Sequence, residues 1–475
     1  MSSSWKTVTS TALVSASRLD VFSKTDFVES RVRGYQTSWS RTLFREYLRA
    51  TRPDGKFSEN NTKFSLEDYE IEFIRLIDSM RVDGFDSTKG RIPVGKSGII
   101  NGAHRLATAI CLGIDVEIEE SSEEDQVYDF HFMRRIGLSN VFRQQMVWNL
   151  IKKRNDTRAY LLTGISGDTE KKIVRAITEF AQVVSVERIE LTQIGERRLM
   201  ELAYSHNDWW CSRFRETMVA ERFTSGNSHC TIVFIIGSDL NLLGNQKDYL
   251  RTILGDINFD RQIHGTDTYS DTITLGEVLL NKNGVQFMNT APLDSESRVI
   301  DQVGGPRLFN SCSDIEIPWC IDGSAVLEIF GIRRAKDIDY VALDGHQIID
   351  PLVRSGDDHK KEFQFYPLNS DDIILDPRLH FRYLGLKIMS LPTITYVKNY
   401  LLDPKAIEDI DLITRFVKRD GPIYKDQKSN RTARIWRIEL FLGSIYERIL
   451  SILPKKYVGK IRHVVNIYRK RGRDI

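Results

Sequence analysis

The sequence predicts a multidomain protein of the α/β and α+β classes, on three observations. A chain of 475 residues is longer than one hydrophobic core usually covers and suggests about three domains. Its 41% hydrophobic and 28% charged residues are ordinary for a globular protein. An apolar, strand-like run leads through a Gly-containing turn into a helix-like pattern at three places, 92–109, 159–172 and 319–330.

Charge and cysteine content exclude several classes of protein. A net charge of +2 gives no overall attraction to nucleic acid. The five cysteines are odd in number and lack Cys-x-x-Cys spacing, so neither a zinc site nor a disulfide framework is expected. There is no signal-peptide pattern and no run of 18 apolar residues, which predicts a cytoplasmic protein.

Residues 1–30 are rich in Ser and Thr and show little periodicity, so a loosely held lead-in is expected there. Residues 31–130 form the first predicted domain. An amphipathic helix follows Phe64, with Ser65 as its N-cap. Strand-like residues 92–100 then lead into a helix that starts near Asn101-Gly102-Ala103-His104-Arg105.

The start of this helix is a candidate anion site. Its unpaired N–H groups, close backbone approach at Gly102, and the side chains of His104 and Arg105 all suit a phosphate. Residues 65–130 resemble the ParB/sulfiredoxin fold, whose members include nucleotide hydrolases and free-serine kinases. Asn101 stands where the kinase-like members carry Asp, while the resemblance still implies nucleotide or phosphate binding through Gly102, His104 and Arg105. The alternative is an ordinary helix start whose basic side chains bond locally.

The same resemblance raises DNA binding as an alternative function. A ParB-like partition protein needs a helix-turn-helix and a basic face. The segment after residue 130 shows neither, and residues 121–125 are acidic. Nucleic acid is therefore not expected as a partner.

Residues 131–300 predict a central α/β domain of unknown role. The strand at 159–162 ends in a Gly-rich turn without the Gly-Lys-Ser/Thr pattern of a phosphate-binding loop. The apolar run 230–236 predicts a fully buried strand with helices over both faces of its sheet. His264, Asp267 and Thr268 form a polar turn before a helix, which suits either capping or substrate binding. Capping is favoured because Thr and Asp are preferred caps, and the sequence does not identify a ligand for this domain.

The stretch Trp319–Leu343 is the strongest candidate for chemistry. A short strand ends at Gly323-Ser324, a helix follows, and a second strand carries Asp337 and Asp339. Alternation along a strand places both carboxylates on one face, where they repel each other unless a cation such as Mg²⁺ lies between them. Because Gly323 has no side chain, phosphates could approach the backbone there, and the Ser324 hydroxyl would hydrogen-bond them. The alternative is a β-α-β unit with solvated carboxylates.

Residues 310–415 resemble the DNA polymerase β-like nucleotidyltransferase superfamily, whose signature is Gly-Ser, a helix, then Asp-x-Asp. The resemblance implies a domain at 301–425, with Asp337 and Asp339 as catalytic metal ligands. It also implies Mg²⁺ as cofactor and a nucleoside triphosphate, ATP or CTP, as substrate. A third metal carboxylate is expected in this superfamily, and four candidates remain open: Asp350, Glu362, Asp371 and Asp372.

Asp376-Pro377 predicts the start of an ordinary amphipathic helix with solvated charges, which carries Leu379, Phe381, Leu384 and Lys387. The alternative is that Lys387 reaches a phosphate. Residues 426–475 predict amphipathic helices and a basic tail. The tail has an apolar stripe beside many Lys and Arg residues, which suits peripheral contact with an anionic membrane surface. A solvated tail packed on the domain is the alternative, and nucleic acid is the weakest partner for these charges.

These predictions together favour a magnesium- and nucleoside-triphosphate-dependent nucleotidyl or phosphoryl transferase acting on an unknown acceptor. The arrangement of domains also resembles, loosely, uncharacterised proteins of bacterial surface-polysaccharide gene clusters, which implies a role in glycan assembly. The alternative from the binding class is a catalytically inactive nucleotide sensor or scaffold.

Overall fold

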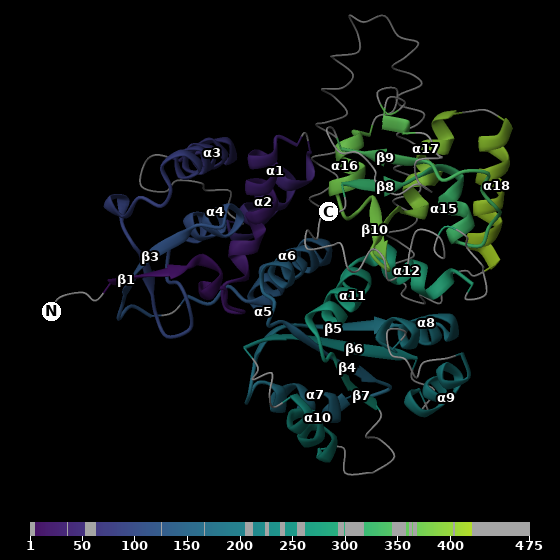
Figure 1. Ribbon diagram of the computed structural model, residues 1–475, viewed down its shortest axis with the longest axis horizontal. Coiled ribbons are helices and arrows are strands. Elements are labelled where there is room, and N and C mark those ends of the chain that lie inside the picture. The colour runs from purple at the N-terminus through teal and green to yellow at the C-terminus, as the bar shows by residue number, and fades with distance from the viewer. Residues whose placement is uncertain are drawn as a thin grey trace, which may run out of the picture. The chain divides into compact units, whose positions relative to one another are not determined.

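The computed structural model describes residues 5–35, 37–52, 63–124, 126–165, 167–204, 212–223, 228–237, 243–253, 262–292, 299, 318–343, 358–360, 363, 368–401 and 404–419. It is a mixed α/β protein, as predicted, and within the described residues it has three small sheets, each with its own helices (Figure 1). The chain up to Arg415 forms one compact unit. In the part of the chain that the structure describes, none of the helices has the length and apolar character needed to cross a membrane. The predicted basic tail lies outside the described residues.

The N-terminal sheet has three strands in the order β1-β3-β2. The elements of this region are β1 (Trp5–Thr9), η1 (Ser10–Leu13), η2 (Leu19–Ser23), α1 (Thr25–Arg33), α2 (Trp39–Thr51), α3 (Leu66–Asp83), η3 (Ser87–Lys89), β2 (Ile92–Val94), α4 (Ala103–Leu112) and β3 (Asp115–Glu120). Ser65 caps α3 through a capping box with Asp68, so the predicted N-cap is confirmed. Gly113, at φ +67°, ends α4 and turns the chain into β3.

Residues 5–30 are not a loose lead-in, so that part of the expectation was wrong. Strand β1 pairs antiparallel with β3 along its whole length, from Trp5 opposite Glu119 to Thr9 opposite Asp115. All five residues of η2 are buried. Pairing with a strand more than a hundred residues away supplies the order that the local sequence does not predict.

The central sheet has the strand order β5-β6-β4-β7, with every neighbouring pair antiparallel. The elements of this region are α5 (Phe130–Arg135), α6 (Asn140–Lys153), β4 (Arg158–Thr163), α7 (Gly167–Ile177), β5 (Gln182–Glu190), α8 (Gln193–Tyr204), α9 (Ser212–Arg222), β6 (His229–Ile236), α10 (Leu243–Thr252), β7 (Ile263–Gly265), α11 (Tyr269–Leu279) and α12 (Lys282–Thr290). Order and direction match the β-α-β-β-α-β, or split β-α-β, topology of ferredoxin-like folds, with α8 and α9 added between its second and third strands.

Strand β6 is buried at every residue, and helices cover both faces of its sheet, as predicted. On one face Val233 and Ile235 pack into an apolar cluster with Ile173 of α7 and Leu250 of α10. Because side chains alternate along a strand, Phe234 points to the other face, where Gly276 of α11 lies against it. Figure 1 shows α7 and α10 on one side of this sheet and α8 and α11 on the other. Thr268 caps α11 with a capping box, which confirms the predicted cap.

The third sheet has the order β10-β11-β8-β9, in which β8 and β11 run parallel and the other pairs antiparallel. Its region contains β8 (Trp319–Ile321), α15 (Gly323–Ile329), β9 (Tyr340–Ala342), α16 (Ser370–Leu375), β10 (His380–Tyr383), β11 (Leu386–Met389), α17 (Leu391–Leu401) and α18 (Pro404–Arg419). Strand, turn and helix at 319–329 are as predicted.

The helix expected from Asp376 is instead the hairpin β10–β11. Leu384 and Gly385 form its two-residue turn, both with positive φ, +49° and +75°, as in a type I′ turn. Every residue of both strands is buried. Polar and apolar residues do alternate along them, in His380-Phe381-Arg382-Tyr383 and Leu386-Lys387-Ile388, as is typical of strands, so the helix prediction was wrong. The hairpin places β11 next to β8, where Ile388 pairs with Ile321.

Candidate functional site

Gly323 sits where β8 turns into α15, and the turn needs glycine for two reasons. Its φ is +61°, a left-handed conformation that other residues adopt at a cost. A Cβ atom there would also lie 2.8 Å from Oδ2 of Asp339. The preceding residue, Asp322, caps the helix by accepting a hydrogen bond from the Gly323 N–H. The fold thus brings the predicted Gly-Ser turn and the Asp-x-Asp segment into contact.

Asp337 and Asp339 precede β9, which begins at Tyr340, so neither lies within the strand itself. A backbone hydrogen bond holds Asp339 close to the Gly323 turn, because the Asp322 N–H donates to the carbonyl oxygen of Asp339 at 2.9 Å. The Asp339 side chain is 14% exposed, and Asp337 is half-buried. Ser324, expected to bind phosphate, is buried beside the turn.

Two residues of this site were not predicted from the sequence, Asp322 and His359. Nδ1 of His359 lies 3.2 Å from Oδ2 of Asp322, and its Nε2 lies 3.9 Å from Oδ1 of Asp339. The imidazole therefore lies between two carboxylates. Asp322 could have been recognised as an N-cap at the end of a strand. Nothing in the local sequence distinguishes His359, because its partners are distant in the chain.

The third metal carboxylate is not found among the described candidates. Asp350 and Glu362 lie outside the described residues. Asp371 and Asp372 are on α16 and contact other groups: Lys360 Nζ lies 3.4 Å from Asp371, while the Thr37 hydroxyl and the Ser38 N–H donate to Asp372. Within the described ranges, no three acidic, His or Cys side chains are grouped to hold a metal ion. Two carboxylates still suit Mg²⁺, which usually keeps several waters and binds substrate phosphates.

Lys387 does not extend toward this turn. It is 1% exposed on β11, and its ammonium group donates to the carbonyl oxygen of Ile374 at 2.7 Å. The expectation that it could reach a phosphate depended on a helix that does not form.

The second candidate site, at the start of α4, has the predicted backbone. Gly102 precedes the helix and has a φ of +89°. The Gly102 N–H donates a hydrogen bond to Oδ1 of Asn101 at 2.6 Å. The Arg105 guanidinium, however, donates to the carbonyl oxygens of Gly90 and Arg91, the latter at 3.2 Å. In this structure the planar fork of Arg105 ties α4 to the loop before β2.

His104 lies in a basic and aromatic environment. Its ring meets the ring of Phe73 edge-on, with 4.7 Å between centroids. Burial lowers the pKa of His104 well below its usual value, and the charges of Lys24, Lys63 and Arg52 lower it further. Lys24 and Lys63 also pair with carboxylates, of Asp20 at 3.8 Å and of Glu72 at 3.0 Å. The ten-residue helix has no acidic residue in its first turn, so its positive N-terminal end, together with these cations, favours an anion. These cations come from outside the predicted motif.

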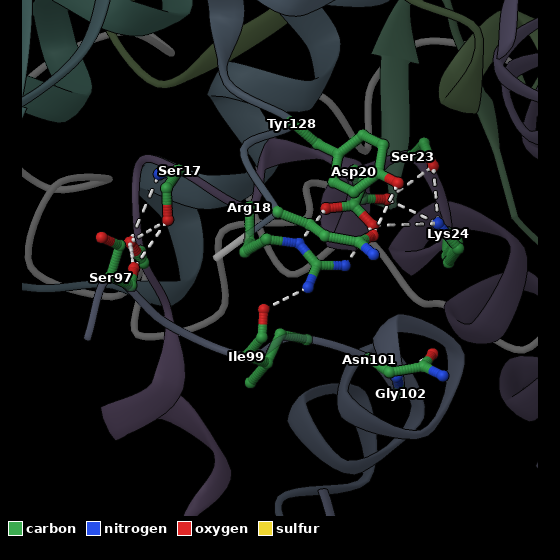
Figure 2. A network of polar contacts seen from close by, with 12 residues as sticks. Ser17, Arg18, Asp20, Ser23, Lys24, Ser97, Ile99, Asn101, Gly102 and Tyr128 are labelled. Atoms are coloured by element: carbon green, nitrogen blue, oxygen red, sulfur yellow. Dashed lines mark hydrogen bonds and ion pairs between the residues drawn. The ribbon is translucent and has the colours of Figure 1, made fainter. Parts of the chain in front are cut away.

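Lys24 belongs to a buried network of charges beside this helix (Figure 2). Arg18 and Asp20 form a two-point ion pair at 2.8 and 2.9 Å, and Arg18 also donates to the carbonyl oxygen of Ile99, just before the Asn101 turn. Lys24 donates to the backbone oxygen of Asp20 at 2.8 Å, and burial lowers its pKa to about 8. The network fixes the loop that leads into α4 and keeps a cation next to it.

Compared with protein-family models, with curated proteins and with solved structures, the chain has no match in any of the three. Its function must therefore be inferred from the geometry and chemistry of the two sites.

Proposed function

We propose that this protein is a magnesium- and nucleoside-triphosphate-dependent nucleotidyl or phosphoryl transferase, with Asp337 and Asp339 as the metal-binding residues. One observation carries the proposal: the Asp339 carboxylate lies against Gly323, so closely that a Cβ atom at that position would meet it at 2.8 Å. A carboxylate held beside a half-buried glycine backbone can share one cation with a phosphate that approaches the same turn.

Chemistry of this kind depends mostly on positioning and on neutralising charge. A hydroxyl oxygen of the acceptor would attack phosphorus, and pyrophosphate would leave in nucleotidyl transfer, or a nucleoside diphosphate in phosphoryl transfer. Mg²⁺ would neutralise the developing negative charge. Asp337 and Asp339 would hold the cation, while Gly323 and Ser324 would position the phosphates. The acceptor is a sugar or glycan if the looser resemblance to surface-polysaccharide proteins applies.

The N-terminal site supports phosphate binding at a second place. Gly102 and His104 lie at the start of α4, where Lys24, Lys63 and Arg52 add positive charge. Arg105 would contribute indirectly, by fixing the helix to the Gly90–Arg91 backbone. A site of this composition suits a nucleoside polyphosphate or free phosphate.

The test is Asp339→Asn, assayed for magnesium-dependent release of pyrophosphate or nucleoside diphosphate. We expect turnover to be lost while the melting temperature stays nearly unchanged or rises, because the amide keeps the shape and removes a repelling charge. Asp248→Asn is the matched control, since its side chain is 72% exposed on α10, and it should retain full turnover. Full activity in Asp339→Asn would refute the proposal.

A second candidate function is a nucleotide sensor without catalysis. The specific observation in its favour is that Asp371 and Asp372, two candidates for the third carboxylate, are occupied by other contacts. Calorimetry with ATP and CTP in the presence of Mg²⁺, followed by product analysis over several hours, separates the two functions. Binding without product would favour the sensor, and product formation would favour the transferase.

A further inference from the structure

A small polar cavity lies among α6, α11, α16 and β10, and its lining residues do not include those of either candidate site. Its volume is about 40 Å³. One water molecule needs roughly 10–15 Å³ by the same measure, so the cavity holds about three waters or one small polyatomic ion. The polar and aromatic side chains that line it include Gln145, Trp148, Lys152, Glu277, His380 and Arg382.

His380 offers the cavity a hydrogen-bond acceptor. The residue is 5% exposed, and its Nδ1 lies 2.9 Å from the carbonyl oxygen of Ile373. A carbonyl only accepts, so Nδ1 carries the hydrogen and Nε2 has a lone pair. Burial lowers the pKa of His380 well below its usual value, and the charges of Lys387 and Arg382 add to this, which keeps the ring neutral. Among the described residues Nε2 has no hydrogen-bond partner.

The other charged groups make the lining positive. Arg382 is 9% exposed, with its guanidinium over the Trp148 ring at 5.8 Å from the centroid, and Lys152 is half-buried at the same cavity. Glu277 is 7% exposed, and burial raises its pKa to about 7. Two cations thus face one carboxyl group that is only partly ionised at neutral pH. A partly buried lining with net positive charge favours an anion.

We propose that this cavity binds a small oxyanion that carries one O–H group, with Arg382 and Lys152 donating to its oxygens and its O–H donating to Nε2 of His380. Bicarbonate and monohydrogen phosphate both have this chemistry. A neutral His380 disfavours an ion without a proton to donate, because the lone pair of Nε2 would face another lone pair. The bound ion would link α6 to β10.

The test is calorimetry on the full chain at pH 7.5 and constant ionic strength, with inorganic phosphate, bicarbonate and sulfate in turn. Sulfate is similar in size to phosphate and carries no proton at this pH, so we expect it to bind at least tenfold more weakly than phosphate or bicarbonate. Whichever of these two binds more tightly identifies the ion. Equal affinity for sulfate, or no binding by any of the three, would overturn the proposal.

Variants test whether the ion binds in this cavity or at the candidate site beside Gly323. Arg382→Gln should weaken binding of the preferred ion at least tenfold, and Asp339→Asn should leave it unchanged. Arg251→Gln, a change of the same kind on the exposed surface of α10, is the matched control. If Arg382→Gln fails to fold by circular dichroism, Lys152→Gln at the same cavity replaces it. Unchanged affinity in the folded variant would assign the ion to another site and overturn the proposal.

Discussion

Gly323→Ala tests the contact on which the proposed function depends, without any ligand. A side chain at φ +61° costs about 1–2 kcal/mol by itself, because Cβ crowds the following carbonyl oxygen. The new Cβ would also meet Oδ2 of Asp339 at 2.8 Å and its Cβ at 3.3 Å, so the Asp339 segment must move. Crowding of this kind typically adds about 1–3 kcal/mol. We therefore expect a total loss of roughly 2–5 kcal/mol in local stability.

Two controls separate the backbone cost from the contact with Asp339. Gly113→Ala has nearly the same φ, +67°, with open space around its Cβ, so it should show the backbone cost alone. In an Asp339→Ala background the closest contact is gone, and Gly323→Ala should cost about 1–2 kcal/mol less than in the parent. The difference between the two backgrounds measures the contact.

Native-state hydrogen exchange followed by mass spectrometry is the suitable assay, because a multidomain chain does not unfold in one step. Peptides covering 319–343 report the Gly323 variants, and peptides covering 103–120 report Gly113→Ala. If Gly323→Ala costs no more than Gly113→Ala, or costs the same with and without the Asp339 carboxylate, the two segments are not in contact. The proposed metal site would then lose its structural basis.

Two further predictions concern Glu277 and Arg105. Burial raises the pKa of Glu277 from its usual 4.5 to about 7, so the folded chain holds a proton there that the unfolded chain releases, and the free energy of unfolding falls as pH rises from 4.5 to 7. Glu277→Gln should remove that pH dependence and be more stable than the parent above pH 7, by about 3 kcal/mol. An unchanged pH profile in this variant would contradict the raised pKa. Arg105→Ala should cost about 0.5–1.5 kcal/mol of stability for each of its hydrogen bonds to the Gly90 and Arg91 carbonyls, because water can replace the guanidinium there. Lys should restore only part of this loss because it lacks the planar fork. A variant that melts like the parent yet loses phosphate affinity would show that Arg105 binds the ligand directly.

Features set by neighbouring residues were predictable from the sequence. Ser65 and Thr268 each stand three residues before an Asp at the start of an apolar periodic run, and both cap helices as expected. The unbroken apolar run of β6 correctly predicted a sheet covered on both faces. These signals depend on the backbone within a few residues, so no knowledge of the rest of the fold is needed to interpret them.

The β10–β11 hairpin shows why a correct list of core residues can still give the wrong element. Leu379, Phe381 and Leu384 were assigned to one helix, although polar and apolar residues alternate in His380-Phe381-Arg382-Tyr383 and in Leu386-Lys387-Ile388, as in a strand. Gly385, which has positive φ, marks the turn between these two runs. Strand β1 was missed for a different reason, because its partner β3 lies more than a hundred residues away.

The least predictable parts of both sites are the charged groups brought in from other segments. His359 reaches Asp322 from 37 positions along the chain, and Lys24, Arg52 and Lys63 approach His104 from three separate segments. Motifs locate a turn and the side chains that immediately follow it, whereas the charge around that turn is set by tertiary packing. Charge decides whether a glycine turn holds phosphate, because the free backbone N–H groups alone attract an anion only weakly in water. The basic surroundings of His104 and the carboxylates beside Gly323 therefore give the two turns opposite preferences: the first suits a phosphate directly, and the second only when a cation accompanies it.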